Sequence, residues 1–220
     1  MNIFLSIFIF SLVLFLYLHI QYQVKMSNDL EVYTIERPTK DKLEEVCDLR
    51  QPVIFDYDNQ EIVEKCNLSN LEEQYGAFDI KLRNISEDDD DSKQMYLPFL
   101  FKEAVELFQN GKNKCYITEK NKDFLKETGT VKTFKYNDAF LRPYFVSNCN
   151  YDVCSGSVDC KTPLRYNLNY RNYFYLTSGS INLKLIPPSG SKYLNTIKDY
   201  ENFEFRSSVN PWNVQKEYQK

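Results

Sequence analysis

Residues 162–188 read TPLRYNLNYRNYFYLTSGSINLKLIPP, and this stretch decides the fold more than any other part of the chain. The run Arg171–Thr177 predicts a strand, and Ile181–Ile186 predicts another because its apolar and polar residues alternate. Ser178-Gly179-Ser180 predicts a tight turn between them, since glycine adopts positive φ at little cost. Pro187-Pro188 ends the second strand, because proline cannot donate to a central ladder.

The order of these motifs resembles the core of the cupin-like, JmjC-related hydroxylases, which use Fe(II) and 2-oxoglutarate. Thr162-Pro163-Leu164 opens the motif, and Asn172, Gly179 and Pro187-Pro188 keep the family's mutual spacing. Downstream, residues 205–210 are similar to the family's S-x-V-[DN] segment. The resemblance covers roughly the second half of the chain and implies a jelly roll, a double-stranded β-helix. The stretch is also similar to cupin-like proteins of large DNA viruses, which implies a viral protein in a host or virion membrane.

The chain departs from this family at the positions that bind the metal. Arg165 stands where the family has histidine, and Asn167 stands where it has aspartate. One extra residue precedes Asn172, and shifting the register by one places Tyr166 and Leu168 at the ligand positions instead. Neither register supplies a pair of metal ligands.

The residue at the cosubstrate position and the number of histidines also argue against oxygenase chemistry. Ile181 stands where the family anchors 2-oxoglutarate with lysine, and the only histidine is His19 in the apolar N-terminus. A 2-His-1-carboxylate iron site needs two imidazoles, and the Ser-His-Asp and Cys-His arrangements also need a histidine. We therefore expect a pseudoenzyme without iron or 2-oxoglutarate. The alternative is a hydroxylase whose non-standard metal site is built from Asp, Glu and Cys.

Arg165 is the residue whose environment matters most for function. A buried, unpaired guanidinium is costly, so we expect it to pair with a carboxylate or a bound anion, or to face solvent. One hypothesis is an anion-binding pocket made by Arg165, Asn167 and Asn172, with Tyr166 and Ile181 as further candidates for its lining. The other hypothesis is that all these residues are structural.

Composition limits the remaining classes. The chain has 220 residues, enough for one domain plus an appendage, and its 17 Tyr and 16 Phe allow a substantial core. The net charge of −4 and the absence of a basic stripe argue against nucleic-acid binding. We expect a non-catalytic binding or structural protein that uses its Tyr-rich surface to contact a protein partner, whose identity the sequence does not give.

The N-terminus predicts a membrane anchor. Residues 3–20 are almost unbroken Ile, Phe, Leu, Val and Tyr. As a helix they extend about 27 Å, close to the roughly 30 Å hydrocarbon core of a bilayer. A cleaved signal peptide is the alternative, but no Lys or Arg precedes the run and no A-x-A-like site follows it. We expect a single-pass anchor in contact with lipid. Its orientation stays open, because acidic residues surround Lys25.

The predicted fold class is α+β, with helices packed on an incomplete jelly roll. We divide the chain into an anchor with its flank (1–24), a juxtamembrane linker (25–36), a cupin-like domain (37–213) and a polar tail (214–220). Further strands are expected at residues 31–35, 52–55, 77–82, 115–118, 131–136 and 203–207. Helices are expected after Thr39 and at residues 61–65, 69–74, 97–110 and 193–200.

Two kinds of modification are suggested by short motifs. Cys149, Cys154 and Cys160 lie within twelve residues, but their spacing matches no zinc motif. One disulfide among them is a possibility for a lumenal domain, and ordinary partly buried thiols are the alternative. Asn67-Leu68-Ser69 and Asn84-Ile85-Ser86 are sequons, so Asn67 and Asn84 are candidate glycosylation sites.

Overall fold

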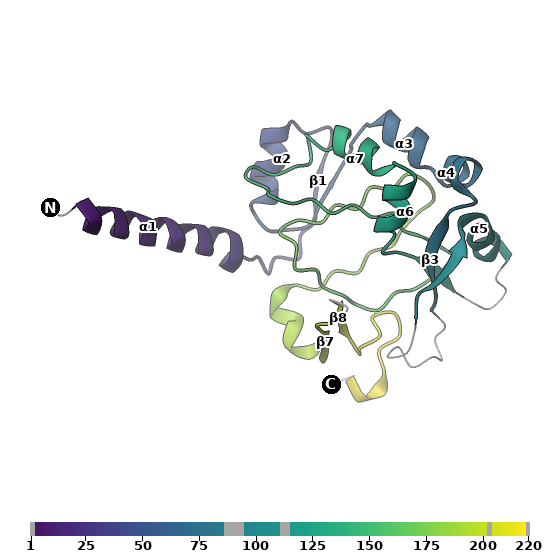
Figure 1. The fold of residues 1–220 in the computed structure, drawn as a ribbon. Helices are drawn as coiled ribbons and strands as arrows, with labels where there is room; N and C mark the ends of the chain where they lie inside the picture. Colours follow the sequence, from purple (N-terminus) through teal and green to yellow (C-terminus); the bar gives the residue numbers. More distant parts are fainter. Residues whose placement is uncertain (1–2, 86–94, 111–114, 202–203, 219–220) are drawn as a thin grey trace.

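An exposed apolar helix precedes the folded part of the chain. The computed structural model describes residues 3–85, 95–110, 115–201 and 204–218. Helix α1 spans Ile3–His19 and continues as the π-helical turn η1, Ile20–Val24. The run Ile3–Val24 has 22 residues, and an 18-residue stretch within it has a mean hydropathy of 2.6. The run projects away from the domain (Figure 1). Membrane spans and signal sequences share this length and composition, whereas a core helix would be mostly buried and no residue of this run is.

The domain begins with a small parallel sheet. Strand β1, Tyr33–Ile35, pairs in parallel with β2, Val53–Phe55, and helix α2, Lys40–Cys47, connects them. Thr39 caps α2, because its hydroxyl accepts a hydrogen bond from the Lys42 amide at 3.3 Å. The sequence predicted all three elements and this cap, so these predictions are confirmed.

Two short helices follow and meet at one asparagine. Helix α3 spans Gln60–Cys66 and α4 spans Leu68–Tyr75. The side chain of Asn67 accepts from the amide of Asn70 at 2.8 Å and donates to the carbonyl of Glu64 at 2.9 Å. It therefore caps both helices at once. The helices predicted at residues 61–65 and 69–74 are both present, and the break between them is the single residue Asn67.

A four-stranded antiparallel sheet forms the centre of the domain. Its order is β4-β3-β5-β6, with bounds Leu97–Leu100 for β4, Asp79–Asn84 for β3, Tyr116–Thr118 for β5 and Ser155–Gly156 for β6. Helix α5, Phe101–Asn110, starts directly after β4. The prediction of one helix over residues 97–110 was therefore wrong for its first turn, because those residues pair with β3 instead.

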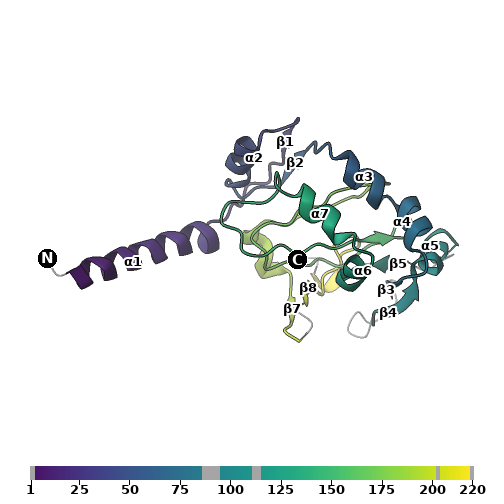
Figure 2. The same ribbon diagram turned by 45° about the horizontal axis from the view of Figure 1, so that its top comes forward.

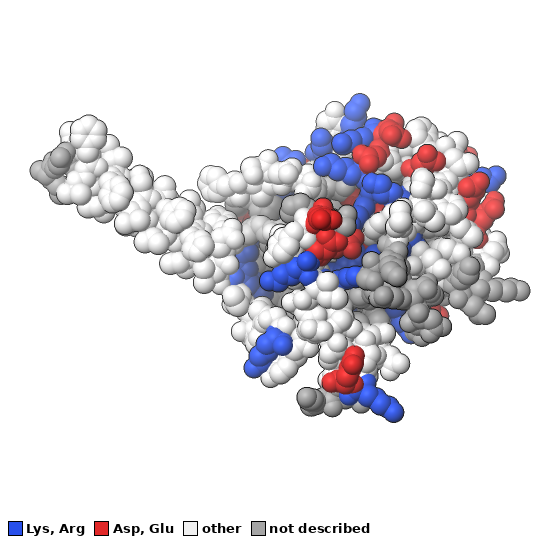
Figure 3. Space-filling view, turned by 60° about the horizontal axis from the view of Figure 1, so that its bottom comes forward, with Lys and Arg blue, Asp and Glu red and all other residues white. Residues whose placement is uncertain are grey.

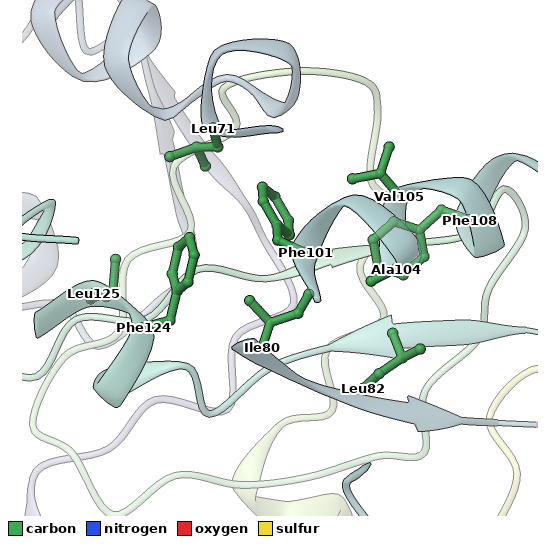
Figure 4. Packing of buried hydrophobic residues seen from close by; sticks show 9 residues of the cluster. All are labelled: Leu71, Ile80, Leu82, Phe101, Ala104, Val105, Phe108, Phe124 and Leu125. Atoms are coloured by element: carbon green, nitrogen blue, oxygen red, sulfur yellow. The ribbon is translucent and has the colours of Figure 1, made fainter. Parts of the chain in front are cut away.

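The hydrophobic core lies between this sheet and the helices α4, α5 and α6 (Figure 4). Leu71, Phe101, Leu125 and Val105 are each 1% exposed, and Ala104 is completely buried. Ile80 and Leu82 point from β3 toward α5, as alternation along a strand requires. The core thus uses one face of the sheet and leaves the opposite face of β3 for other contacts.

Two helices cover the edge of this core, and one of them corrects a prediction. Helix α6 spans Lys122–Glu127 and α7 spans Val131–Asn137. The alternation of residues 131–136 predicted a strand, and the structure shows a helix. Val131 and Phe134 also have the i, i+3 spacing of one helical face, and both pack against the core. For so short a run, tertiary packing decides between the two periods.

The stretch 162–188 is extended but not paired as predicted. No strand is assigned at residues 171–177 or 181–186, so both of these predictions were wrong. The turn between them is present, with Gly179 at φ 80°. Side-chain contacts hold the first segment in place of a ladder: Tyr175 Oη donates to the carbonyl of Tyr57 at 3.0 Å, and Thr177 Oγ1 to that of Cys66 at 3.0 Å.

The C-terminal region contains a second two-stranded sheet. The 3-10 helix η3 spans Pro188–Tyr193, and β7, Thr196–Asp199, pairs antiparallel with β8, Glu204–Ser207. A short turn, η4, follows at Lys216–Tyr218. The predicted helix over 193–200 was therefore wrong, whereas the last predicted strand is confirmed over its described residues. The described chain is α+β, as predicted, with one four-stranded and two two-stranded sheets, and the jelly roll stays a prediction.

Candidate functional site

Three charged side chains meet on the face of the central sheet opposite the core. In β3, Arg83 lies opposite Ile117 of β5. Glu119 is two residues beyond Ile117, and side chains two apart share a face, so Glu119 lies on the same side as Arg83. Arg165 reaches them because its segment pairs with β8, where the Tyr166 amide donates to the carbonyl of Phe205 at 3.0 Å. We call this set the Arg83–Glu119–Arg165 cluster.

Both guanidinium groups of the cluster bind the same carboxylate. Arg165 Nη1 donates to the two oxygens of Glu119 at 2.8 Å each, and Arg83 Nη2 lies 3.2 Å from Glu119 Oε1. The side chain of Arg83 is only 3% exposed, that of Glu119 14% and that of Arg165 23%. Of the three alternatives expected for Arg165, a carboxylate, a bound anion or solvent, the structure shows the carboxylate.

An aromatic ring and a second ion pair complete the cluster. The guanidinium of Arg83 lies 5.0 Å and the ammonium of Lys120 5.2 Å from the centre of the Tyr96 ring. Tyr96 Oη also donates a hydrogen bond to Glu119. Lys120 forms an ion pair with Glu204 of β8. The cluster therefore connects the central sheet to the C-terminal two-stranded sheet.

Several donors in this cluster form no hydrogen bond. Among the described residues, Arg83 Nε and Nη2 and Arg165 Nη2 are buried without a hydrogen-bond partner. Arg83 thus has an ion pair with Glu119 but not the fork-to-fork geometry that a guanidinium usually reaches with a carboxylate. Donors left in this state cost stability, and an acceptor oxygen that reached them would recover that cost.

The charged groups at the cluster are balanced. Arg83 and Arg165 share Glu119, and Lys120 forms an ion pair with Glu204. Asp152 is a third carboxylate close enough to act on Glu119. At the edge of the site, the backbone amide of Lys120 donates to Asp152 at 2.7 Å.

Burial also changes the acidity of the cluster. It raises the pKa of Glu119, while the hydrogen bond from Tyr96 and the charge of Arg83 lower the pKa in part. Burial raises the pKa of Tyr96 far above that of a free phenol, and the neighbouring Glu119 raises it further. At neutral pH the Tyr96 hydroxyl therefore keeps its proton and acts as a donor.

The other predicted pocket residues do not join Arg165. Tyr166 stacks on Phe205 with the ring centres 4.9 Å apart. Asn167 is exposed, Asn172 is exposed and accepts from Asn169 at 3.0 Å, and Ile181 is 55% exposed. The cluster draws instead on residues that sequence reasoning did not select, Arg83, Tyr96 and Glu119. No local pattern marks them, because only strand pairing brings them together.

The iron of the family that the sequence resembles does not fit these residues. The described residues contain no group of three His, Cys, Asp or Glu side chains that could hold a metal ion. Arg165, at the position of the family's histidine, is a cation held by Glu119 and cannot ligate another cation. His19 is exposed on α1, outside the domain. We therefore derive no oxygenase step.

The structure places the predicted disulfide cysteines and the two predicted glycosylation asparagines as follows. All six cysteines are free thiols, including Cys149, Cys154 and Cys160. The thiol of Cys160 is hydrogen-bonded to that of Cys115, and burial raises the pKa of Cys160 to about 12. The amide of Asn67 is engaged in the helix cap described above, and Asn84, at the end of β3, has a buried side-chain oxygen.

Two buried phenols lead to a prediction about alkaline pH. Burial raises the pKa of Tyr96 and raises that of Tyr173 to about 12, whereas a phenol in the unfolded chain titrates near pH 10. Their contribution to stability is full below about pH 10 and is lost as the pH rises toward the folded-state pKa. We expect the free energy of unfolding to fall above about pH 10, and absorbance at 295 nm to show late-titrating tyrosines.

Two variants test this prediction. Tyr96→Phe should reduce the slope of the unfolding free energy against pH, by at most about 1.4 kcal/mol per pH unit. Tyr136→Phe, the control at an exposed residue, should leave this slope unchanged. An unchanged slope in Tyr96→Phe would contradict the assignment.

Comparison with protein-family models, with curated proteins and with solved structures finds no match to this chain. The function of the site must therefore be argued from its geometry and charge.

Proposed function

We propose that the chain is a membrane-anchored, non-catalytic binding domain that holds an anionic group at the Arg83–Glu119–Arg165 cluster. The observation that carries this proposal is the guanidinium of Arg83, which is only 3% exposed. Its Nε and Nη2 form no hydrogen bond, although Nη2 lies 3.2 Å from Glu119 Oε1. A cation with free donors inside a protein is the chemistry that recognises an oxyanion.

The neighbours of Arg83 define what kind of anion would bind. Arg165 also has a free Nη2, and Lys120 has a 40% exposed side chain, so the site can be approached from solvent. The Tyr96 hydroxyl adds a neutral donor beside them. Planar guanidinium groups match carboxylate and phosphate oxygens, so we propose a small carboxylate or phosphate group, free or carried by a partner protein.

The membrane part of the proposal rests on helix α1. No residue of its apolar run is buried, and such a surface is stable in lipid but not in water. A degenerate cupin-like origin and a viral setting belong to the same proposal. They are supported by the spacing of Thr162-Pro163-Leu164, Asn172, Gly179 and Pro187-Pro188.

A thermal-shift titration of the detergent-solubilised full chain tests the binding site. The probes are inorganic phosphate and succinate, with ionic strength held constant by chloride. We expect a saturable rise in Tm of several degrees, since a ligand at about 100 times its Kd stabilises the folded state by about 2.7 kcal/mol. Arg165→Met should abolish the rise, while Lys132→Met, which removes the same charge from exposed surface, should keep it. No rise over chloride for either probe, or equal rises in both variants, would overturn the proposal.

A further inference from the structure

The last turn of the apolar helix is fixed directly to the domain. Arg50 Nη2 donates to the carbonyl of Gln21 at 2.9 Å and to the hydroxyl of Tyr170 at 2.9 Å. The guanidinium also lies 4.3 Å from the centre of the Tyr170 ring. The ring of Tyr22 contacts that of Tyr170, with centres 5.2 Å apart. Two consecutive residues of the helix are therefore held by side chains from two distant parts of the domain.

The length of the helix places these contacts at the membrane surface. At 1.5 Å per residue, the 22 residues of Ile3–Val24 extend about 33 Å, slightly more than the roughly 30 Å hydrocarbon core. Gln21 and Tyr22 lie in the final turn, so in a spanning helix they reach the headgroup layer. Because the domain touches these two residues, no spacer separates it from the bilayer. Residues 25–36, predicted as a linker, cannot act as a long tether.

Helix η3 lies beside the same end of α1 (Figures 1 and 2). The amide of Ser189 in η3 donates to Asn28 Oδ1 at 2.7 Å, which joins η3 to the segment just after the helix. Tyr193, at the end of η3, is 70% exposed, and the ammonium of Lys192 lies 4.8 Å from its ring. Ile186, just before η3, is 41% exposed. In the space-filling view, Lys and Arg side chains gather beside the base of the uncharged helix (Figure 3).

We propose that residues 186–193 form a second membrane contact, which we call the lipid seat, and that it lies in the phospholipid headgroup layer. Exposed Tyr and Lys side chains are those that favour this layer, because each combines an apolar body with a polar end. The occupant we infer is the bilayer that holds α1, since the seat continues from the base of that helix. Asp29 and Glu31 nearby offset Lys25 and Lys192, so a zwitterionic phosphatidylcholine surface is sufficient. The inference rests on the proposed membrane anchoring and adds that the domain sits against the bilayer.

Tryptophan quenching by brominated lipid tests the lipid seat. Trp212 is the only tryptophan, so Trp212→Phe provides a background without one. Tyr193→Trp and Tyr136→Trp are then made separately in the full chain and placed in phosphatidylcholine vesicles. Tyr136 is the matched control, because it is an exposed tyrosine at 81% and lies on α7, away from the anchor. The quencher is phosphatidylcholine brominated near the headgroup end of its acyl chains.

We expect quenching of the Tyr193→Trp fluorescence by roughly half and little quenching of the Tyr136→Trp fluorescence, as an interfacial position requires. Carbonate extraction of the same vesicles measures anchoring separately. Equal quenching of the two variants in chains that resist extraction would overturn the lipid seat and leave the anchor intact. Release of the chains by carbonate would overturn the anchor and the lipid seat together. Circular dichroism that matches the unsubstituted chain confirms that both variants are folded.

Discussion

Placing two arginines at the centre of α1, Leu12→Arg with Leu14→Arg, should release the chain from membranes. Each arginine at the middle of a spanning helix costs about 2.5–3.5 kcal/mol of insertion free energy, so the pair costs about 5–7 kcal/mol. The helix has no buried residue, so the folded domain does not depend on it. We expect the unsubstituted chain to stay in the carbonate-resistant pellet and the double variant to move to the soluble fraction, still folded.

The control for this experiment adds the same charge outside the span. Tyr136 and Phe145 are 81% and 97% exposed, so Tyr136→Arg with Phe145→Arg should leave the chain in the pellet. Retention of the α1 double variant in the pellet would contradict a spanning helix. The mass of the purified chain separates an anchor from a signal sequence, because cleavage after residues 1–24 would remove the helix altogether.

Removing the shared carboxylate, Glu119→Ala, should destabilise the domain by about 3–5 kcal/mol. The loss is large because it leaves two guanidinium groups, of Arg83 and Arg165, without the carboxylate that both of them contact. It also removes the acceptor of the Tyr96 hydroxyl. Urea denaturation followed by circular dichroism measures this change. We expect the midpoint urea concentration to fall while the dependence of the unfolding free energy on urea, the m value, stays the same.

Two further variants show whether charge or packing is responsible. Glu103→Ala on the exposed face of α5 should change stability by no more than about 0.5 kcal/mol. Replacing the whole cluster with apolar residues, Arg83→Met, Glu119→Leu and Arg165→Met, should recover much of the loss, since no buried charge is then left alone. A loss below about 1 kcal/mol in Glu119→Ala would show that the cluster is more open to water than its burial indicates.

These two tests and the binding test separate the roles of the cluster. A cluster that only holds the central sheet to the C-terminal strands would show the stability loss and no response to phosphate or succinate. A binding site would show both, because the bound anion would accept hydrogen bonds from the nitrogens of Arg83 and Arg165 that form none in the structure. The stability measurement therefore does not depend on the ligand.

Local chemistry made several elements predictable. The cap at Thr39 and the strand at β3 follow from side-chain hydrogen bonding and from alternation within a few residues. The apolar run of α1 is equally local, since length and composition alone define it. The cost of burying an unpaired charge limited Arg165 to a carboxylate, a bound anion or solvent, and the carboxylate is the one found.

Other features depended on neighbours that are distant in sequence. Residues 131–136 satisfy both the strand and the helix period, and packing of Val131 and Phe134 on the core selects the helix. Residues 171–177 have the composition of a strand, but a strand also needs a paired neighbour, and here Tyr57 and Cys66 accept side-chain hydrogen bonds instead. A β-propensity describes how well a side chain fits a sheet and does not provide the adjacent strand.

The sequence by itself determined the apolar N-terminal helix, the α+β class and the lack of the histidines that an iron site needs, because each depends on residue type or on spacing over one or two turns. The tertiary structure alone decided which carboxylate meets Arg165 and which side chains hold the end of α1. Glu119 is 46 residues from Arg165, and Tyr170 is 120 residues from Arg50. Contacts over such separations are set by strand register and by the path of the chain, which no local pattern encodes.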